Sequence, residues 1–227
     1  IHFMPIIQIP SLDDVITATL KLAEAGDRMT HLCICPMSEE IIRAALELAV
    51  EHDYPAIIIP DRNQVSEHEG GGFITGLTPQ SLVEQIEQIE QSIGVGPGAK
   101  EPWLRYVCLD HCGLWTRWYG NDERELEEND ALEAVKKTLT ACLLADYKAI
   151  HLDCSFPAPA HIRIDEEKII KLNTELIEFA EQERIRLGKP PIAYEVGTEE
   201  TVGTGISVDH FRDSISKTFA ELEKTGQ

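Results

Sequence analysis

Short apolar runs alternate with helical patterns along the whole chain. The runs are apolar on both faces, which is typical of parallel strands covered by helices. Each is followed, directly or after a polar loop, by apolar residues at helical spacing or by residues that start helices. The predicted strands cover 31–36, 55–60, 104–110, 148–155 and 191–197, and the helices after them cover 38–53, a stretch from 78, 126–146, 165–187 and 207–224.

Residues that cap helices stand where these helices should begin. Ser11 precedes two aspartates and predicts a further helix ahead of the first strand. Ser38 caps the next helix, and Pro79 suits the first helical position of the one after it. The helix after Ser38 is predicted to present one apolar face, formed by Ile41, Ile42, Ala45, Leu46 and Ala49.

Repeated strand–helix units predict an α/β fold with a parallel sheet. An open doubly wound sheet and a TIM-type (β/α)8 barrel are both compatible with the repeat. Polar residues crowd at the strand ends, and only in a barrel do all those ends converge on one mouth. These residues are Asp61, Arg62, Asn63, Asp110, His111, Asp153, Ser155, Glu195 and Glu199.

The barrel predicted from this sequence is incomplete. A TIM barrel has eight strands, whereas the chain supplies five strand–helix units. Five strands alone would expose two sheet edges and half of the barrel interior to water. We therefore expect one barrel domain over 1–227 that lacks its C-terminal side, with the remaining strands outside this sequence or supplied by another chain.

Charge narrows the classes of partner. The chain of 227 residues is 43% hydrophobic and carries a formal charge of −20. That charge argues against binding nucleic acid or an anionic membrane, both of which attract positive proteins. No signal peptide or membrane-length apolar run is found, and the six cysteines lie mostly in apolar runs, so we expect free thiols and a cytoplasmic protein.

The stretch LDHCG at 109–113 carries the most suggestive chemistry. It places Asp110 beside His111 at the end of a predicted strand. There the imidazole can bind a divalent metal, and the carboxylate can take a proton from a substrate held at that metal. The other interpretation is that the pair only caps the following loop.

Other polar stretches could bind substrate or could serve only the structure of the protein. The loop DRNQVSEHEGGG is either a substrate lid, with Asn63 and Gln64 bonding sugar hydroxyls, or a plain loop, and it lacks the P-loop pattern of kinases. The stretch WTRWYG (115–120) is assigned to packing or a subunit contact, and the acidic run at 121–130 to a solvated helix start. His151 is assigned to the packed or barrel-lining residues, and His68, His161 and His210 to the surface.

LDHCG resembles the TDHC-type segment of class II, zinc-dependent ketose-bisphosphate aldolases. The longer pattern is more similar to the so-called non-catalytic subunit of class II tagatose-bisphosphate aldolase, a family formerly labelled tagatose-6-phosphate kinase. The resemblance covers residues 40 to 220 and rests on the order and spacing of several segments: NQV (63–65), GG with TGLTP (71–79), DHCG (110–113), ENDALEAVKK with KAIHLDCS (128–155) and YEVGTEE (194–200).

The resemblance implies a role for each matching residue. It implies that Asp110 is the general acid/base and that His111 is a zinc ligand. Asp153 matches a carboxylate near the metal-binding histidine, and Glu195 matches a glutamate that serves zinc in an alternative position. Glu199 matches the family's GTE glutamate and is assigned a catalytic role, although the sequence leaves open which of the two glutamates faces the mouth. The residues predicted to bind substrate are Asn63, Gln64, Asp153 and Ser155.

The chain departs from the family pattern in three places. Pro60 and Asp61 stand where the family has a glutamate, and CPMSEE (35–40) lacks the Cys-Ser-x-His pattern of the family. Two further zinc histidines and the glycine-rich phosphate site of the aldolases come from later strands that this sequence lacks. His151 and His161 are not expected to replace those histidines.

The implied chemistry is carbon–carbon cleavage beside a ketone. Cleavage leaves an enediolate, which zinc stabilises as a Lewis acid while a carboxylate takes the proton of the neighbouring hydroxyl. Rotation and re-addition would invert C4, so the same residues suit an aldolase or a 4-epimerase acting on a ketohexose phosphate. The alternatives are a non-catalytic subunit that stabilises a separate aldolase subunit, and a sugar-binding or unrelated barrel enzyme. A homo-oligomer is also compatible with the sequence.

Overall fold

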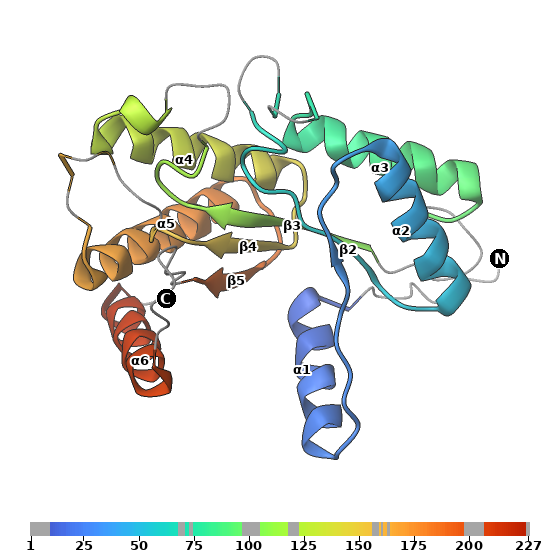
Figure 1. Ribbon diagram of the computed structural model, residues 1–227, viewed down its shortest axis with the longest axis horizontal. Helices are drawn as coiled ribbons and strands as arrows, with labels where there is room; N and C mark the ends of the chain where they lie inside the picture. Colours follow the sequence, from blue (N-terminus) through green and yellow to red (C-terminus); the bar gives the residue numbers. More distant parts are fainter. Residues whose placement is uncertain are drawn as a thin grey trace.

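The computed structural model describes residues 10–67, 71–72, 75–96, 105–117, 123–155, 159, 161–162, 164–197 and 207–225. Strands and helices alternate through these ranges (Figure 1). The strands are β1 (Cys33–Ile34), β2 (Ala56–Ile58), β3 (Arg105–Cys112), β4 (Ala149–Leu152) and β5 (Ala193–Val196). The helices are α1 (Leu12–Glu24), α2 (Glu39–His52), α3 (Pro79–Ile93), α4 (Glu128–Leu144), α5 (Glu166–Arg186) and α6 (Val208–Thr225), with a short 3-10 helix at Glu123–Glu125.

The five strands form one parallel sheet in the order β1-β2-β3-β4-β5. A doubly wound sheet would reverse its strand order at a switch point, and no reversal occurs among these strands. Strand order identical to chain order is the arrangement of consecutive units in a (β/α) barrel. The α/β prediction is confirmed, and the closed eight-stranded barrel stays a prediction.

Capping explains where the helices begin. Ser11 and Asp14 form a reciprocal capping box at α1, and Thr78 and Ser81 form another at α3, which has Pro79 in its first turn. The Ser38 side chain caps α2 as predicted.

The buried face of α2 is narrower than the sequence pattern suggests. Ile42, Leu46 and Ala49 are fully buried, whereas Ile41 is 41% exposed. The prediction for Ile41 was wrong because the sheet covers only one side of the apolar stripe.

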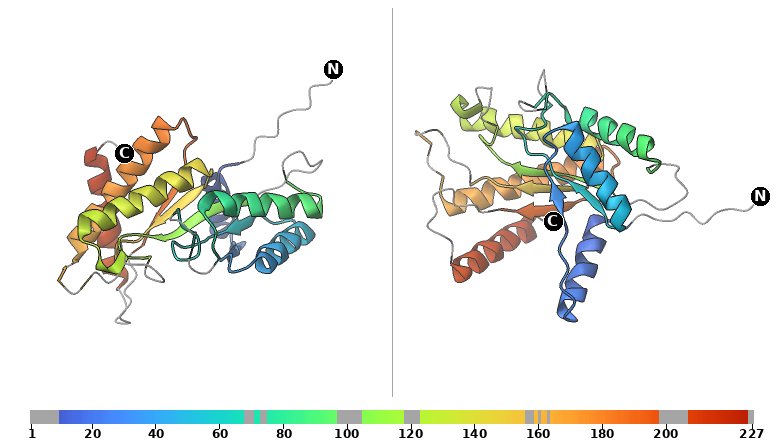
Figure 2. Two further views of the ribbon diagram at one scale, coloured as in Figure 1. Left: turned by 90° about the horizontal axis from the view of Figure 1, so that it is seen from above. Right: turned by 45° about the vertical axis from the view of Figure 1, so that its right-hand side comes forward.

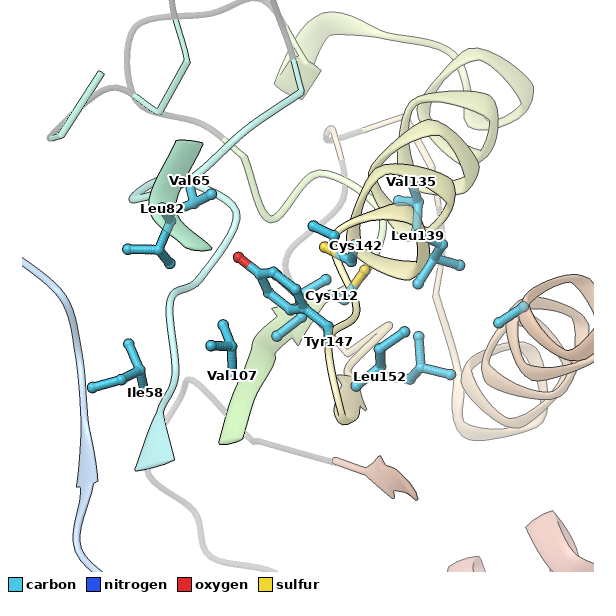
Figure 3. Packing of buried hydrophobic residues seen from close by; sticks show 14 of the residues in the cluster. Ile58, Val65, Leu82, Val107, Cys112, Val135, Leu139, Cys142, Tyr147 and Leu152 are labelled. Carbon is cyan, nitrogen blue, oxygen red and sulfur yellow. The ribbon is translucent and has the colours of Figure 1, made fainter. Parts of the chain in front are cut away.

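The two faces of the sheet are covered differently. Alternate strand residues, such as Ile58, Val107 and Ile150, point into a large core beneath α2, α3, α4 and α5. Side chains from β2, β3, β4, α3 and α4 meet in this layer (Figure 3). The right-hand view of Figure 2 shows the helices over this layer and α1 standing apart from them.

The other face is the inner one in a barrel arrangement. Its small apolar cluster joins Leu12 of α1 to Ile57, Tyr106 and Cys108, while the polar residues described below lie nearer the carboxyl ends of the strands. Cys108, Cys112, Cys142 and Cys154 are buried free thiols, whereas Cys33 and Cys35 are free but exposed. Among the described helices, none is both long and apolar enough to cross a membrane.

Candidate active site

Strand β3 is distorted where it carries Asp110 and His111. Its pairing with β4 shifts register between Leu109 and Cys112, and His111 has a φ of 43°, which is unusual for a residue with a side chain. The strand therefore continues past its predicted end at residue 110. The irregular backbone breaks the alternation that would send neighbouring side chains to opposite faces, so the Asp110 and His111 side chains come within 3.8 Å of each other (Oδ2 to Nε2).

A third residue, His151 of β4, completes a compact cluster. Ligand atoms of Asp110, His111 and His151 all lie within 4.8 Å of one another. The His151 Nδ1 atom is 2.8 Å from Asp110 Oδ1, and because an ionised carboxylate only accepts, this nitrogen donates. The two imidazole rings lie 5.0 Å apart between centroids.

Asp153 supports His111 from behind. Its Oδ2 lies 3.2 Å from His111 Nδ1, and its Oδ1 accepts from the backbone N–H of Ser155 at 2.9 Å and from the Ser155 hydroxyl. A buried carboxylate fixes the tautomer of the histidine in this way and leaves the Nε2 lone pair to act as a ligand. Asp153 is only 1% exposed, so the structure gives it an orienting position rather than an accessible one.

His151 is held against β5. A Cβ atom at Gly197 would lie 2.2 Å from His151 Nε2, so the ring fits only because residue 197 is glycine. His151 Nε2 is buried and has no hydrogen-bond partner among the described residues. Glu195 pairs with His151 in the register of β4 and β5 and is exposed, but it is outside the three-residue cluster.

Mutual hydrogen bonds set the charge of the cluster. Burial alone would raise the pKa of Asp110, but the hydrogen bond from His151 and the charge of His111 outweigh burial, so this pKa lies below its usual value. Burial alone would lower the pKa of His151, whereas the hydrogen bond to Asp110 and the charge of Glu195 hold it above its usual value. Burial would likewise raise the pKa of Asp153, and the hydrogen bonds from His111 and Ser155 lower it instead. The carboxylates are therefore ionised at neutral pH.

The donor set fits a divalent metal. Two imidazoles and one carboxylate are common ligands of zinc, and a carboxylate behind a ligating histidine is a regular companion of such sites. The nitrogen of His151 that faces Asp110 is Nδ1, and it could ligate the ion once it releases its proton, as metal binding requires. Asp110, His111 and His151 could hold the ion, with Asp153 orienting His111.

The remaining predicted residues lie in different surroundings. Asn63 donates its side-chain amide to the Thr116 carbonyl at 3.0 Å, and Gln64 bonds the Asp61 backbone and the Met37 sulfur. These bonds give both amides a role in shaping the loop after β2. Their predicted contacts to substrate stay predictions. Glu199 lies outside the described residues.

Two expectations about charged residues were wrong. Arg62 does not face the mouth with the other residues at the strand ends, because its side chain is fully buried on the helix side of the sheet. Glu123, in the acidic run assigned to a solvated helix start, is 4% exposed and forms an ion pair with Arg62 at 2.7 Å. Trp115 is fully buried, as its assignment to packing predicts, and His161 and His210 are exposed as expected.

Sequence reasoning missed His151 as a member of the cluster. The signal that could have found it is the spacing of His151 and Asp153, since residues two apart on a strand share one face. The missing information was the register that places His151 beside Asp110 on the neighbouring strand.

The fold and the cluster define an α/β protein of consecutive strand–helix units, with imidazoles and carboxylates gathered near the carboxyl ends of its central strands. The chain belongs to the family described as D-tagatose-1,6-bisphosphate aldolase subunit GatZ/KbaZ-like, whose model matches residues 16–225. This match confirms the resemblance inferred from the sequence.

Two relatives place the chain more closely. It is 28% identical over 195 residues to a D-tagatose 6-phosphate 4-epimerase of Agrobacterium fabrum (strain C58), covering 86% of this chain and 42% of that protein. Its fold is similar, with a TM-score of 0.67 and 22% identity, to the crystal structure of a probable tagatose 6 phosphate kinase from Sinorhizobium meliloti 1021, covering 86% of this chain and 44% of that one. The chain thus spans less than half the length of either relative.

Proposed function

We propose that this chain carries part of a metal-dependent active site that acts at C3–C4 of a ketohexose phosphate. The reaction we favour is 4-epimerisation between tagatose 6-phosphate and fructose 6-phosphate, because the relative from Agrobacterium fabrum bears the name of that activity. Retro-aldol cleavage of tagatose 1,6-bisphosphate uses the same bond and is the closest alternative. The observation that carries the proposal is the cluster of Asp110, His111 and His151.

A divalent cation such as Zn²⁺, held by His111, His151 and Asp110, would supply Lewis-acid stabilisation of negative charge on the substrate oxygens. It would also supply the local positive charge that an anionic sugar phosphate needs on a chain with a formal charge of −20.

Asp110 is proposed to move the proton. Its ionised carboxylate takes the proton of the C4 hydroxyl as the C3–C4 bond breaks, which yields an aldehyde at C4 and an enediolate across C2 and C3. If the aldehyde rotates before C3 attacks it again, the new C4 alkoxide takes the proton back from Asp110 and the configuration at C4 is inverted. If the aldehyde leaves instead, the outcome is aldol cleavage.

The two predicted glutamates, Glu195 and Glu199, are proposed to assist the three-residue cluster. Glu195 lies one strand away from the cluster in register with His151, close enough to raise its pKa, and is proposed as an alternative metal ligand. Glu199 is proposed as a further acid/base residue. Two pairs of residues are proposed to shape the substrate site. Asn63 and Gln64 would do so through the loop after β2, and Asp153 and Ser155 through their support of His111.

The test is turnover by the full-length protein. Tagatose 6-phosphate, fructose 6-phosphate and tagatose 1,6-bisphosphate are each incubated with enzyme, with and without a chelator, and the products are followed by NMR. Asp110→Asn should abolish turnover, and Asp146→Asn, an equal change at an exposed turn with φ of 61°, should leave it intact. Chelator-resistant turnover, or full activity of Asp110→Asn, would refute the assignment.

A second candidate is a partner role as one subunit of an aldolase, as the family description suggests. The observation that favours it is the apolar surface of α6, where Val208, Phe211 and Phe219 are 66%, 50% and 63% exposed. This role predicts that a catalytic class II aldolase subunit co-elutes with the protein and gains stability from it. Phe211→Ser combined with Phe219→Ser should then abolish co-elution without affecting metal binding.

A further inference from the structure

A buried ion pair lies beneath the distorted end of β3. Arg62 is fully buried, and its guanidinium meets the Glu123 carboxylate in a fork, with Nη2 2.7 Å from Oε1 and Nη1 3.0 Å from Oε2. Withdrawing two charges from water is costly, and a packed apolar pair of the same volume is often as stable. The question is what this pair holds in place.

The guanidinium joins three segments of the chain. Its Nη1 donates to the Gly113 carbonyl at 2.9 Å, and its Nε donates to the Thr138 hydroxyl of α4 at 3.0 Å. Arg62 itself lies in the turn that follows β2. The Glu123 carboxylate also accepts from the Arg117 backbone N–H at 3.1 Å, which ties the loop after β3 into the same network.

Gly113 stands two residues after His111. Its Cα is packed so tightly against the residue after β4 that an added Cβ would lie 1.7 Å from the Asp153 carbonyl oxygen. On the other side of the distortion, the Asp110 N–H donates to the Pro60 carbonyl at 2.8 Å. The backbone of His111 is therefore fixed both before and after the residue.

The conformation of His111 needs such support. A positive φ at a residue with a side chain is strained and persists only where the surroundings impose it. Arg62 supplies part of this support. Its buried guanidinium donates a hydrogen bond to the Gly113 carbonyl, two residues after His111.

We propose that Arg62, locked by Glu123, is a positioning residue that fixes the backbone of His111 and so sets the affinity of the cluster for its metal. Arg62 does not touch the cation or the substrate and acts through Gly113 and His111. The inference rests on the proposed metal site and adds to it a residue from the opposite side of the sheet.

The chain offers a matched control at the other end of the same strand. Arg105, in the first position of β3, pairs with the fully buried Glu90 of α3 at 3.0 Å. That pair stabilises the fold but lies far along β3 from His111. Breaking either pair should destabilise the protein, and only the Arg62 pair should affect the metal.

The experiment is a Co²⁺ titration of the metal-free, full-length protein, followed by the visible spectrum at a temperature where every variant is folded by circular dichroism. Arg62→Met should weaken Co²⁺ binding by about tenfold or more, as removal of groups that orient metal ligands typically does. Arg62→Lys, which can still reach one carbonyl, should recover part of the affinity, and Arg105→Met should bind like the wild type. Unchanged affinity in Arg62→Met, or an equal loss in Arg105→Met, would overturn the inference.

A second measurement does not depend on the metal. In the metal-free wild type, the ¹⁵N shifts of the His111 ring should show one tautomer, with the proton on Nδ1 facing Asp153, and Arg62→Met should give averaged shifts. Glu123→Gln, which keeps the size of the side chain, serves if Arg62→Met fails to fold, and should show a smaller change in the same direction. Co²⁺ binding that depends on the cluster should disappear in His111→Ala. If the wild type shows no such binding, the proposed function fails. The ¹⁵N shifts of the His111 ring would still decide whether Arg62 positions His111.

Discussion

Replacing Gly197 with alanine should force the His151 ring out of its present position beside Asp110. The added Cβ would lie 2.2 Å from His151 Nε2, about 1.2 Å short of the 3.4 Å at which ordinary contact begins. The ring has little room to retreat, because its other nitrogen is held 2.8 Å from Asp110 Oδ1. The ring must therefore turn aside, and this turn breaks the hydrogen bond from Nδ1 to the carboxylate.

The cost follows from the bond that is lost. A hydrogen bond to a charged group contributes about 1.5–3 kcal/mol, so urea unfolding of metal-free Gly197→Ala should show a loss of that order. Displacing one of three ligands should also weaken Co²⁺ binding by about tenfold or more. Both quantities are measured on the same preparation, by urea titration followed by circular dichroism and by the cobalt spectrum.

The control for this prediction is Gly188→Ala. Gly188 has a φ of 66° and nothing within 4 Å of an added Cβ, so alanine there meets backbone strain of about 1 kcal/mol but no clash. Its Co²⁺ affinity should match the wild type. Gly197→Ala with wild-type stability and affinity would show that the packing of His151 against residue 197 does not hold the ring in place.

Three further outcomes are expected. Asp153→Asn should lower Co²⁺ affinity by about tenfold or more in a calorimetric titration, because the amide can present its NH₂ to His111 and favour the wrong tautomer; equal affinity would rule out an orienting role. Gly113→Ala should give little folded protein by circular dichroism, since its Cβ would lie 1.7 Å from the backbone oxygen of Asp153; a soluble, native variant would contradict this packing. A thiol reagent should modify only Cys33 and Cys35 in the native protein and all six cysteines in urea, because the other four are buried and burial raises the pKa of each, to about 12 for Cys108 and Cys112; fast modification of more than two native thiols would disprove that burial.

Local signals in the sequence were sufficient for the order and type of the elements. The caps at Ser11 and Ser38 and the proline at 79 each mark a helix start that the structure confirms. Their success has a simple cause, since a cap bonds to backbone groups only three residues away and needs no tertiary partner.

The candidate site was predictable only in part. Asp110, His111 and Asp153 stand out because they follow apolar runs, and the structure brings them together. His151 is buried as expected, but its contact with Asp110 was missed, and Arg62 was assigned to the wrong surroundings. Both environments depend on neighbouring strands and helices that are far away in the sequence.

The sequence by itself determined a parallel α/β chain of five strand–helix units, because periodicity and capping act within a few residues. Only the tertiary structure decided which side chains meet. The register between β3 and β4 places His151 beside Asp110, and the distortion at His111 sends two consecutive residues to one cluster. Packing against α4 turns Arg62 away from that cluster. These choices depend on contacts between segments, and a pattern read along one segment does not contain them.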